Sequence, residues 1–198
     1  MAKPIILFDT EFTSWAGAQE RNWSGENEHR EIVQLGALKL DPANDYQVMD
    51  KQILFCKPRI NPTLSDYFMR LTGITQEEVE AYGLSYPELQ RQFAQFIGDC
   101  EVWSYGGDEK VMAENCQIHD IETLQNAQFY DMRKVAKGLG FNPKKYTSGT
   151  LYTAVAPDAA DIQAHNALND CQSMAIFLQT CGQQKQLGYD KLLSLSAA

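Results

Sequence analysis

Two carboxylates, Asp9 and Glu11, stand one residue apart after the apolar run Ile5 to Phe8. In a strand, alternate side chains project from one face and lie about 6.5–7 Å apart along the chain, so both acids would face the same way. Two carboxylates held together repel each other and lose hydration. A divalent cation between them offsets that cost. The pair predicts a metal site, and the alternative is two solvated acids at an exposed strand end.

A third acid, Asp108, follows an expected strand at 101–105 and the turn Gly106-Gly107, where a helix is expected to begin. Open α/β sheets place their ligand sites at such strand-to-helix junctions. Asp is also a common N-cap residue, so a capping role is the alternative for this side chain.

A fourth acid, Asp170, follows His165 by five residues in the stretch Ala164 to Cys171. Asn166 between them is a good N-cap residue. Capping there leaves His165 in the loop before a helix, within reach of Asp170 in its first turns. Taken singly, an acid in a first helical turn and a histidine in a loop are common structural features.

Apolar runs and turn residues predict the elements that must position these side chains. Five strands are expected, at residues 4–9, 31–40, 46–56, 101–105 and 129–131. The first three are expected to form an antiparallel meander. Capping boxes at Thr75-x-x-Glu78 and Ser85-x-x-Glu88 predict two helix starts. Further helices are expected at about 108–116, 131–139, 148–156 and 166–181. This order indicates one α/β domain with a mixed sheet.

Residues 13–30 form a polar insertion directly after the acidic pair. Loops of this length beside a site are often functional or mobile. Its tryptophans, Trp15 and Trp23, either anchor the loop or stack on a base, and anchoring is the preferred interpretation. The role of the insertion is left open.

The acids fall in three motifs that together resemble those of the DEDDh 3′-to-5′ exonuclease family. They are Phe-Asp-Thr-Glu at 8–11, Ser-Tyr-Gly-Gly-Asp at 104–108 and His-x4-Asp at 165–170. The insertion, Lys57-Pro58 and the Leu-Thr-Gly-Ile run at 71–74 are most similar to the Eri-like, or histone-mRNA exonuclease-like, branch. The resemblance spans about residues 4–181. One departure is Asn169, where the family usually has an acid that is not a metal ligand.

The resemblance implies an RNase H-like α/β fold. In that fold a five-stranded mixed β-sheet, antiparallel in its first three strands, has helices on both faces. The exonuclease domain would span residues 1–182. Residues 183–198 would be a C-terminal extension that packs on the same domain or a frayed tail.

The resemblance also implies a metal-dependent 3′-to-5′ exonuclease. Asp9, Glu11, Asp108 and Asp170 would bind two Mg²⁺ or Mn²⁺ ions, with Asp9 bridging them. Two such ions, about 3.5–4 Å apart, activate a water and neutralise the leaving oxygen. His165 would accept the proton of the attacking water. The products would be nucleoside 5′-monophosphates from the 3′ end of a single-stranded nucleic acid, with RNA favoured over DNA.

Five further residues are candidates for substrate binding. Thr10 and Phe12 resemble family positions that meet the terminal nucleotide. Leu71 either wedges against the terminal base or packs in the core. Lys144 and Lys145 belong to the densest basic run of the chain, which would contact the nucleic-acid backbone or form a solvated face.

Composition limits the partners. The chain has 198 residues and a net charge of −9, which argues against coating long nucleic acid through a basic surface. Five scattered cysteines without a C-x-x-C pair indicate reduced thiols in the cytoplasm. Neither a signal-peptide pattern nor a membrane-spanning run is expected. The sequence leaves open whether the protein forms a homodimer.

Two alternatives to the 3′-to-5′ exonuclease function remain. They are a non-catalytic nucleic-acid-binding module on the same fold and a nuclease of dinucleotides and very short oligonucleotides.

Overall fold

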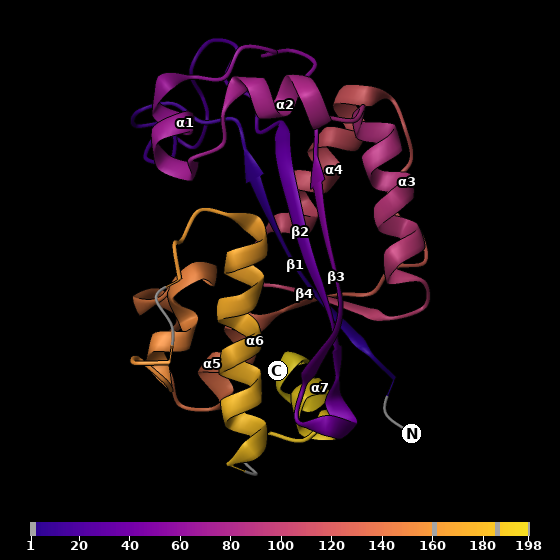
Figure 1. The fold of residues 1–198 in the computed structure, drawn as a ribbon, viewed down its shortest axis with the longest axis vertical. Coiled ribbons are helices and arrows are strands. Elements are labelled where there is room, and N and C mark those ends of the chain that lie inside the picture. Colours follow the sequence, from indigo (N-terminus) through magenta and orange to yellow (C-terminus); the bar gives the residue numbers. More distant parts are fainter. Residues whose placement is uncertain (1–2, 160–161, 185–186, 198) are drawn as a thin grey trace.

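Five strands form one mixed sheet in the order β3-β2-β1-β4-β5 (Figure 1). The computed structural model describes residues 3–159, 162–184 and 187–197. The strands are β1 (Ile5–Phe12), β2 (Ile32–Asp41), β3 (Gln47–Phe55), β4 (Glu101–Ser104) and β5 (Phe129–Asp131). β1 pairs antiparallel with β2 and parallel with β4, and β2 pairs antiparallel with β3. The expected five-stranded mixed sheet is confirmed.

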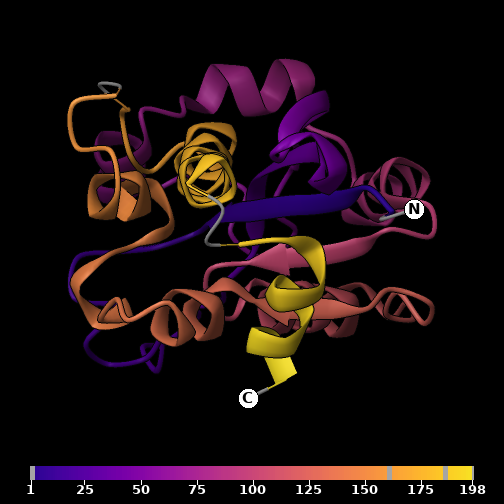
Figure 2. The ribbon, with the colours of Figure 1, turned by 90° about the horizontal axis from the view of Figure 1, so that it is seen from below.

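Helices cover both faces of this sheet (Figures 1 and 2). They are α1 (Asp66–Thr72), α2 (Gln76–Tyr82), α3 (Tyr86–Ile97), α4 (Asp108–His119), α5 (Met132–Gly138), α6 (Ala167–Gln183) and α7 (Tyr189–Ala197). The described residues also form three 3₁₀ helices: η1 (Pro42–Asn44) between β2 and β3, and η2 (Pro143–Lys145) and η3 (Ser148–Ala154) between α5 and α6. Ile5 and Leu7 pack in the core beneath α5, α6 and α7, whereas Ile6 and Phe8 pack beneath α3 and α4. The strand alternation of β1 therefore divides the core into two layers.

The first strand is longer than the sequence pattern predicts. β1 continues to Phe12, so Asp9 and Glu11 lie within the strand and not at its end. By alternation they face the same layer as Ile5 and Leu7, which is the layer that contains α6.

Two local expectations are wrong. Ser85 occupies the N-cap position of α3 but makes no side-chain capping bond. Pro87 at the second helical position has no N–H to donate, and the Glu88 carboxylate accepts hydrogen bonds from Arg91 and Gln92 instead. The capping box at Thr75 and Glu78 is present as predicted.

The helix expected at 148–156 is the 3₁₀ helix η3 at Ser148–Ala154. Its glycine and threonines are poor α-helix formers, and the Thr153 hydroxyl bonds the Thr150 carbonyl at 2.8 Å. A tighter and shorter helix results.

The end of the chain forms α7, which lies close to α5 and buries Leu192 (Figure 2). The Tyr189 hydroxyl donates to Glu101 Oε1 at 3.0 Å. The division of the chain at residue 182 stays a prediction. Within the described ranges, none of the helices combines the length and apolar character that crossing a membrane requires.

Candidate active site

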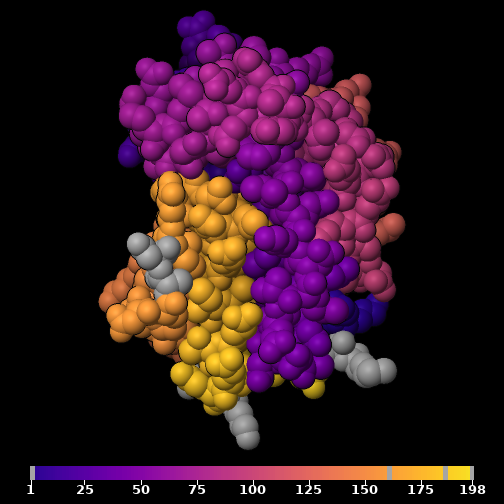
Figure 3. Space-filling view, viewed as in Figure 1, coloured from indigo at the N-terminus to yellow at the C-terminus, as the bar shows by residue number. Residues whose placement is uncertain are grey.

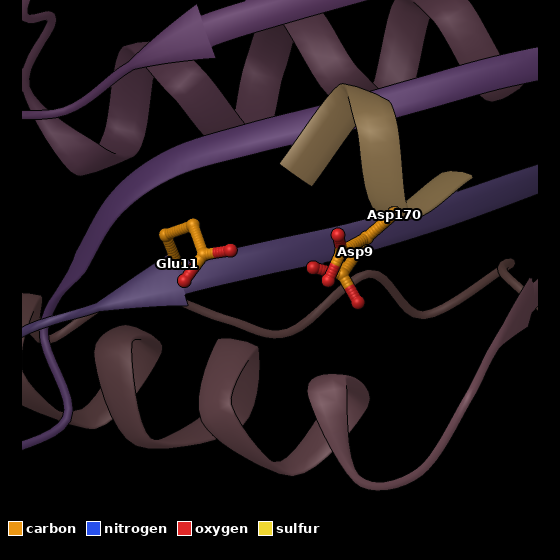
Figure 4. A group of neighbouring side chains, drawn as sticks. All are labelled: Asp9, Glu11 and Asp170. Atoms are coloured by element: carbon orange, nitrogen blue, oxygen red, sulfur yellow. The ribbon is translucent and has the colours of Figure 1, made fainter. Parts of the chain in front are cut away.

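Three carboxylates from distant parts of the chain meet beside the centre of the sheet. Asp9 and Glu11 come from β1, and Asp170 comes from the first turn of α6. One carboxylate oxygen from each lies within 4.8 Å of the others (Figure 4). Asp108, the first residue of α4, lines the same pocket of about 400 Å³. All four side chains are buried.

The approach of α6 to the sheet depends on Gly36. This residue pairs with Asp9 across β1 and β2. A Cβ at Gly36 would lie 2.4 Å from the backbone carbonyl carbon of Ala167, so only glycine lets the helix start lie so close. The Ala167 N–H donates to Gln34 Oε1 at 2.9 Å, and Asn166 caps the helix as predicted. These contacts hold Asp170 over β1.

Asp108 is held in place by hydrogen bonds from Thr10 of β1. The Thr10 backbone N–H and hydroxyl both donate to Asp108 Oδ1, at 3.1 and 2.7 Å. Gly107 is the N-cap residue of α4 and Asp108 is its first helical residue. The alternative of Asp108 as an N-cap is therefore wrong, because its carboxylate is bonded to β1.

Burial raises the pKa of all four carboxyl groups, since charge is poorly hydrated there. The pKa of Asp9 rises well above its usual value through burial and then through repulsion from Asp108, Asp170 and Glu11. Burial raises the pKa of Asp108 to about 6, against the opposing hydrogen bonds from Thr10. The pKa of Asp170 also rises to about 6, mainly through burial. The pocket therefore favours a compensating positive charge.

The donor set fits a divalent metal ion. Asp170 Oδ2 accepts a hydrogen bond from the Ser148 hydroxyl at 3.0 Å, whereas Oδ1 is buried and has no partner among the described residues. A Cβ at Gly149 would lie 2.4 Å from Oδ1, so this glycine keeps the space beside it free. Clustered carboxylate oxygens are the ligands that Mg²⁺ and Mn²⁺ prefer.

His165 lies in the loop before α6 and lines the same pocket. The residue is exposed and its backbone has a left-handed φ of 65°. Partial burial of the ring lowers the pKa of His165, which keeps the imidazole neutral and able to accept a proton near neutral pH.

The structure separates the candidate substrate residues into two groups. Thr10, Phe12 and Leu71 line the pocket with the acids. Both donors of Thr10 are bonded to Asp108, so its observed role is to hold that carboxylate. Lys144 and Lys145 are exposed on η2 and lie outside the pocket lining.

Several pocket residues were not among the sequence candidates. Trp23 and Arg30 come from the insertion, and Arg133 comes from α5, where it pairs with Asp131. Ser148 bonds Asp170 across a separation of 22 residues. Arg133 belongs to the same basic run of the sequence as Lys144 and Lys145, and Trp23 is one of the two tryptophans of the insertion. No sequence signal singled out Ser148.

Comparisons with known proteins agree with this geometry. A family model described as Exonuclease, RNase_T, matches residues 6–178. No curated protein matches the sequence. Among solved structures, the nuclease domain of 3′hExo, a DEDDh family member bound to rAMP, is 20% identical, with a TM-score of 0.78 over 93% of this chain and 94% of that chain.

Two other solved structures extend the comparison. A 3′-exonuclease that recognises the 3′ end of a histone mRNA stem-loop is 19% identical, with a TM-score of 0.77 over 91% of this chain and 82% of that chain. Exonuclease I of E. coli with single-stranded DNA is 15% identical, with a TM-score of 0.69 over 98% of this chain and 43% of that chain. These similarities confirm the RNase H-like fold, which this chain shares with the three exonucleases.

Proposed function

Because this chain belongs to the RNase_T exonuclease family, we propose that it removes nucleotides from the 3′ end of single-stranded nucleic acid. The observation that carries the proposal is the buried cluster of Asp9, Glu11 and Asp170, with Asp108 in the same pocket. The 3′-to-5′ direction is supported by the fold shared with 3′-exonucleases.

The four carboxylates would hold two divalent ions, Mg²⁺ or Mn²⁺. When bound, such ions lower the pKa of an attacking water and stabilise charge on the leaving oxygen. Thr10 fixes Asp108, and Ser148 fixes Asp170, so the ligand oxygens are positioned before metal arrives.

His165 acts as the general base. Its neutral imidazole takes the proton from the attacking water, and its place in the loop at the pocket lets the ring reach toward the acids. Attack at phosphorus breaks the bond to the 3′ oxygen of the preceding nucleotide and releases a nucleoside 5′-monophosphate.

RNA is the favoured substrate. One similar structure has rAMP bound and another protein recognises a histone mRNA stem-loop. Phe12 and Leu71 would contact the terminal nucleotide, whereas Lys144 and Lys145, outside the pocket, would contact the backbone further along the strand. Discrimination from DNA would rest on the 2′-hydroxyl.

A nuclease of very short oligonucleotides is the second candidate. The net charge of −9 and the ion pairs that occupy Arg30 and Arg133 in the pocket favour it, because few cations remain to hold a long strand. A series of substrates of increasing length separates the two candidates. A processor of longer RNA gains affinity with each added nucleotide, whereas a short-oligonucleotide nuclease does not.

Two wider expectations are part of the proposal. Five buried free cysteines suit the reducing cytoplasm. Val48, Met49 and Ile53 are exposed on β3, which lies at the surface between α3 and α6 (Figure 3) and is one of the two edge strands of the described sheet. This apolar edge supports a homodimer, which sedimentation analysis would test.

The direct test is incubation with 3′-labelled and 5′-labelled single-stranded RNA and DNA in Mg²⁺, Mn²⁺ or EDTA. We expect shortening from the 3′ end that requires metal and is lost in Asp9→Asn. The control, Asp190→Asn, changes an exposed acid of α7 and should behave as the wild-type protein does. Absence of metal-dependent shortening with every substrate, or removal of nucleotides from the 5′ end, would overturn the proposal. Binding of RNA that is equally strong in EDTA, without cleavage, would favour the non-catalytic module.

A further inference from the structure

The insertion at 13–30 is a folded wall of the pocket. The Trp23 N–H donates to the Ala18 carbonyl at 2.8 Å, and Ser65, the N-cap of α1, donates to the Ser14 carbonyl at 2.5 Å. Asn61 Nδ2 donates to the Asn27 carbonyl at 3.0 Å. The insertion is thus bonded within itself, to α1 and to the segment before α1, and it lies next to α1 in Figure 1.

Trp23 separates two pockets. Its half-buried side chain lines the carboxylate pocket and also a second pocket of about 490 Å³ beside α4. Arg30 is shared by both pockets in the same way. The acids that line the second pocket, Glu28 and Glu114, are paired with Arg21 and Arg30. A nucleic-acid strand that crosses this wall therefore meets an aromatic ring and acids that are already neutralised.

The Trp23 ring is held in place before any ligand arrives. Its centroid lies 5.5 Å from that of Phe12, and its Nε1 donates to the Thr13 carbonyl at 3.1 Å. The Arg30 guanidinium lies 5.6 Å from the Trp23 centroid and 6.0 Å from the Phe12 centroid. Arg30 Nε is bonded to Glu114 Oε2 at 2.8 Å, which fixes the cation against both rings.

The backbone at Trp23 is in an unfavourable conformation. Asn22 and Trp23 have φ values of 52° and 51°, in the left-handed region that a bulky side chain rarely adopts. Such conformations persist where the surrounding contacts require them, and they cluster at functional sites.

We infer that Trp23 stacks on the nucleobase next to the terminal one, and that the second pocket receives the strand beyond it. The inference rests on the proposed function, in which Phe12 and Leu71 contact the terminal nucleotide. An aromatic ring with a cation at its face suits single-stranded nucleic acid, because every base offers a face for stacking. Trp23 would thus set affinity for the strand and leave the chemistry to the carboxylates.

The kinetic test compares Trp23→Ala, Trp23→Phe and the matched control Trp15→Phe. Trp15 belongs to the same insertion but not to the lining of either pocket. We expect Trp23→Ala to raise KM for an oligonucleotide at least fivefold with little change in kcat, since stacking contributes to binding. Trp23→Phe, which retains a ring, should recover most of that loss, and Trp15→Phe should match the wild-type protein.

An oligonucleotide that lacks the base next to its 3′-terminal nucleotide identifies the contact. The wild-type protein should lose affinity for this abasic substrate, and Trp23→Ala should handle abasic and normal substrates equally. The inference is overturned if removal of this base lowers the affinity of the wild-type protein and of Trp23→Ala by the same factor. It is also overturned if KM is unchanged in Trp23→Ala. In both cases the proposed nuclease function stands.

Tryptophan fluorescence supplies a readout that needs no turnover. In EDTA, a short single-stranded oligonucleotide should quench the emission of Trp15→Phe, whose remaining tryptophans are Trp23 and the buried Trp103. The double variant Trp15→Phe/Trp23→Phe should show no quenching. Equal quenching in both proteins, or none in either at saturating oligonucleotide, would contradict the assignment even if the protein proved not to be a nuclease.

Discussion

The floor and the wall of the pocket are built in different ways. The floor presents Asp9, Glu11, Asp108 and Asp170 from the sheet and from the first turns of two helices. The wall consists of the insertion residues Trp23 and Arg30, held mainly by side-chain contacts. Regular elements fix atoms within tight limits, as metal binding requires, whereas an irregular wall can change without disturbing the sheet. The difference suggests that chemistry belongs to the floor and strand recognition to the wall.

The largest effect should come from His165, a loop residue that the proposed mechanism assigns to the chemistry of the floor. We expect His165→Ala to lower kcat by about 10²–10⁴-fold, the usual contribution of a general base. Metal affinity, measured by calorimetry, should stay close to that of the wild-type protein. If turnover persisted at the wild-type level, His165 would belong with the wall as a recognition residue.

A change beneath the floor should have the next largest effect. Gly36→Ala places a Cβ 2.4 Å from the Ala167 backbone, so α6 must move and carry Asp170 with it. We expect kcat to fall by about 10–100-fold, as in variants that disturb the support of a metal site, and the melting temperature to fall as well. Gly188→Ala is the matched control, because a Cβ there meets nothing within 4 Å. Unchanged kcat in Gly36→Ala would contradict the close docking of α6.

The crowded floor should also destabilise the metal-free protein. The folded-state pKa values of Asp108 and Asp170, about 6, exceed the ordinary value of 3.8. Between these values the folded state binds more protons than the unfolded state, so the free energy of unfolding should fall as pH rises from about 4 to about 6. Each unit of pKa shift corresponds to about 1.4 kcal/mol.

Thermal melts in EDTA across this pH range would measure the effect, and Asp9→Asn should raise the melting temperature at neutral pH by removing one repelling charge. A melting temperature that is independent of pH, or a lower one in Asp9→Asn, would show that the acids are not in conflict when metal is absent.

The smallest effect should come from the wall. Glu114→Ala releases Arg30 from a partly exposed ion pair, and such pairs typically contribute about 0.2–1 kcal/mol. We expect KM for an oligonucleotide to change by about two- to fivefold, with kcat and metal affinity unchanged. Glu77→Ala, an acid in the first turn of α2 away from the pocket lining, is the control. A large loss of kcat in Glu114→Ala would mean that floor and wall are coupled.

The contrast between the floor, built from regular elements, and the wall, held by side-chain contacts, also explains which features the sequence could predict. The strands and the cap at Asn166 follow from local spacing, and the motif resemblance then directs attention to Asp9, Glu11, Asp108 and Asp170. Local patterns also produced the incorrect capping box at Ser85, because they did not account for the missing N–H of Pro87 or for the pairing of Glu88 with Arg91.

The rest depends on tertiary contacts. The space that Gly36 and Gly149 leave can be recognised only once α6 is in place. The position of Trp23 depends on its contacts with Phe12 and Arg30. Lys144 and Lys145 lie exposed on a short 3₁₀ helix, outside the pocket lining. Side-chain type and spacing along the sequence do not predict such contacts between residues that are far apart in the chain.

The packing of α6 on the sheet also determines when the carboxylate cluster can form during synthesis of the chain. The Ala167 N–H meets the Gln34 side chain across a separation of 133 residues, so β1 and β2 leave the ribosome long before their helical partner. Until then the layer that holds Ile5, Leu7, Asp9 and Glu11 lacks the helix that covers it. A nascent chain therefore carries half of its carboxylates without the residue that completes the cluster, and the metal site should mature only after most of the chain has been translated.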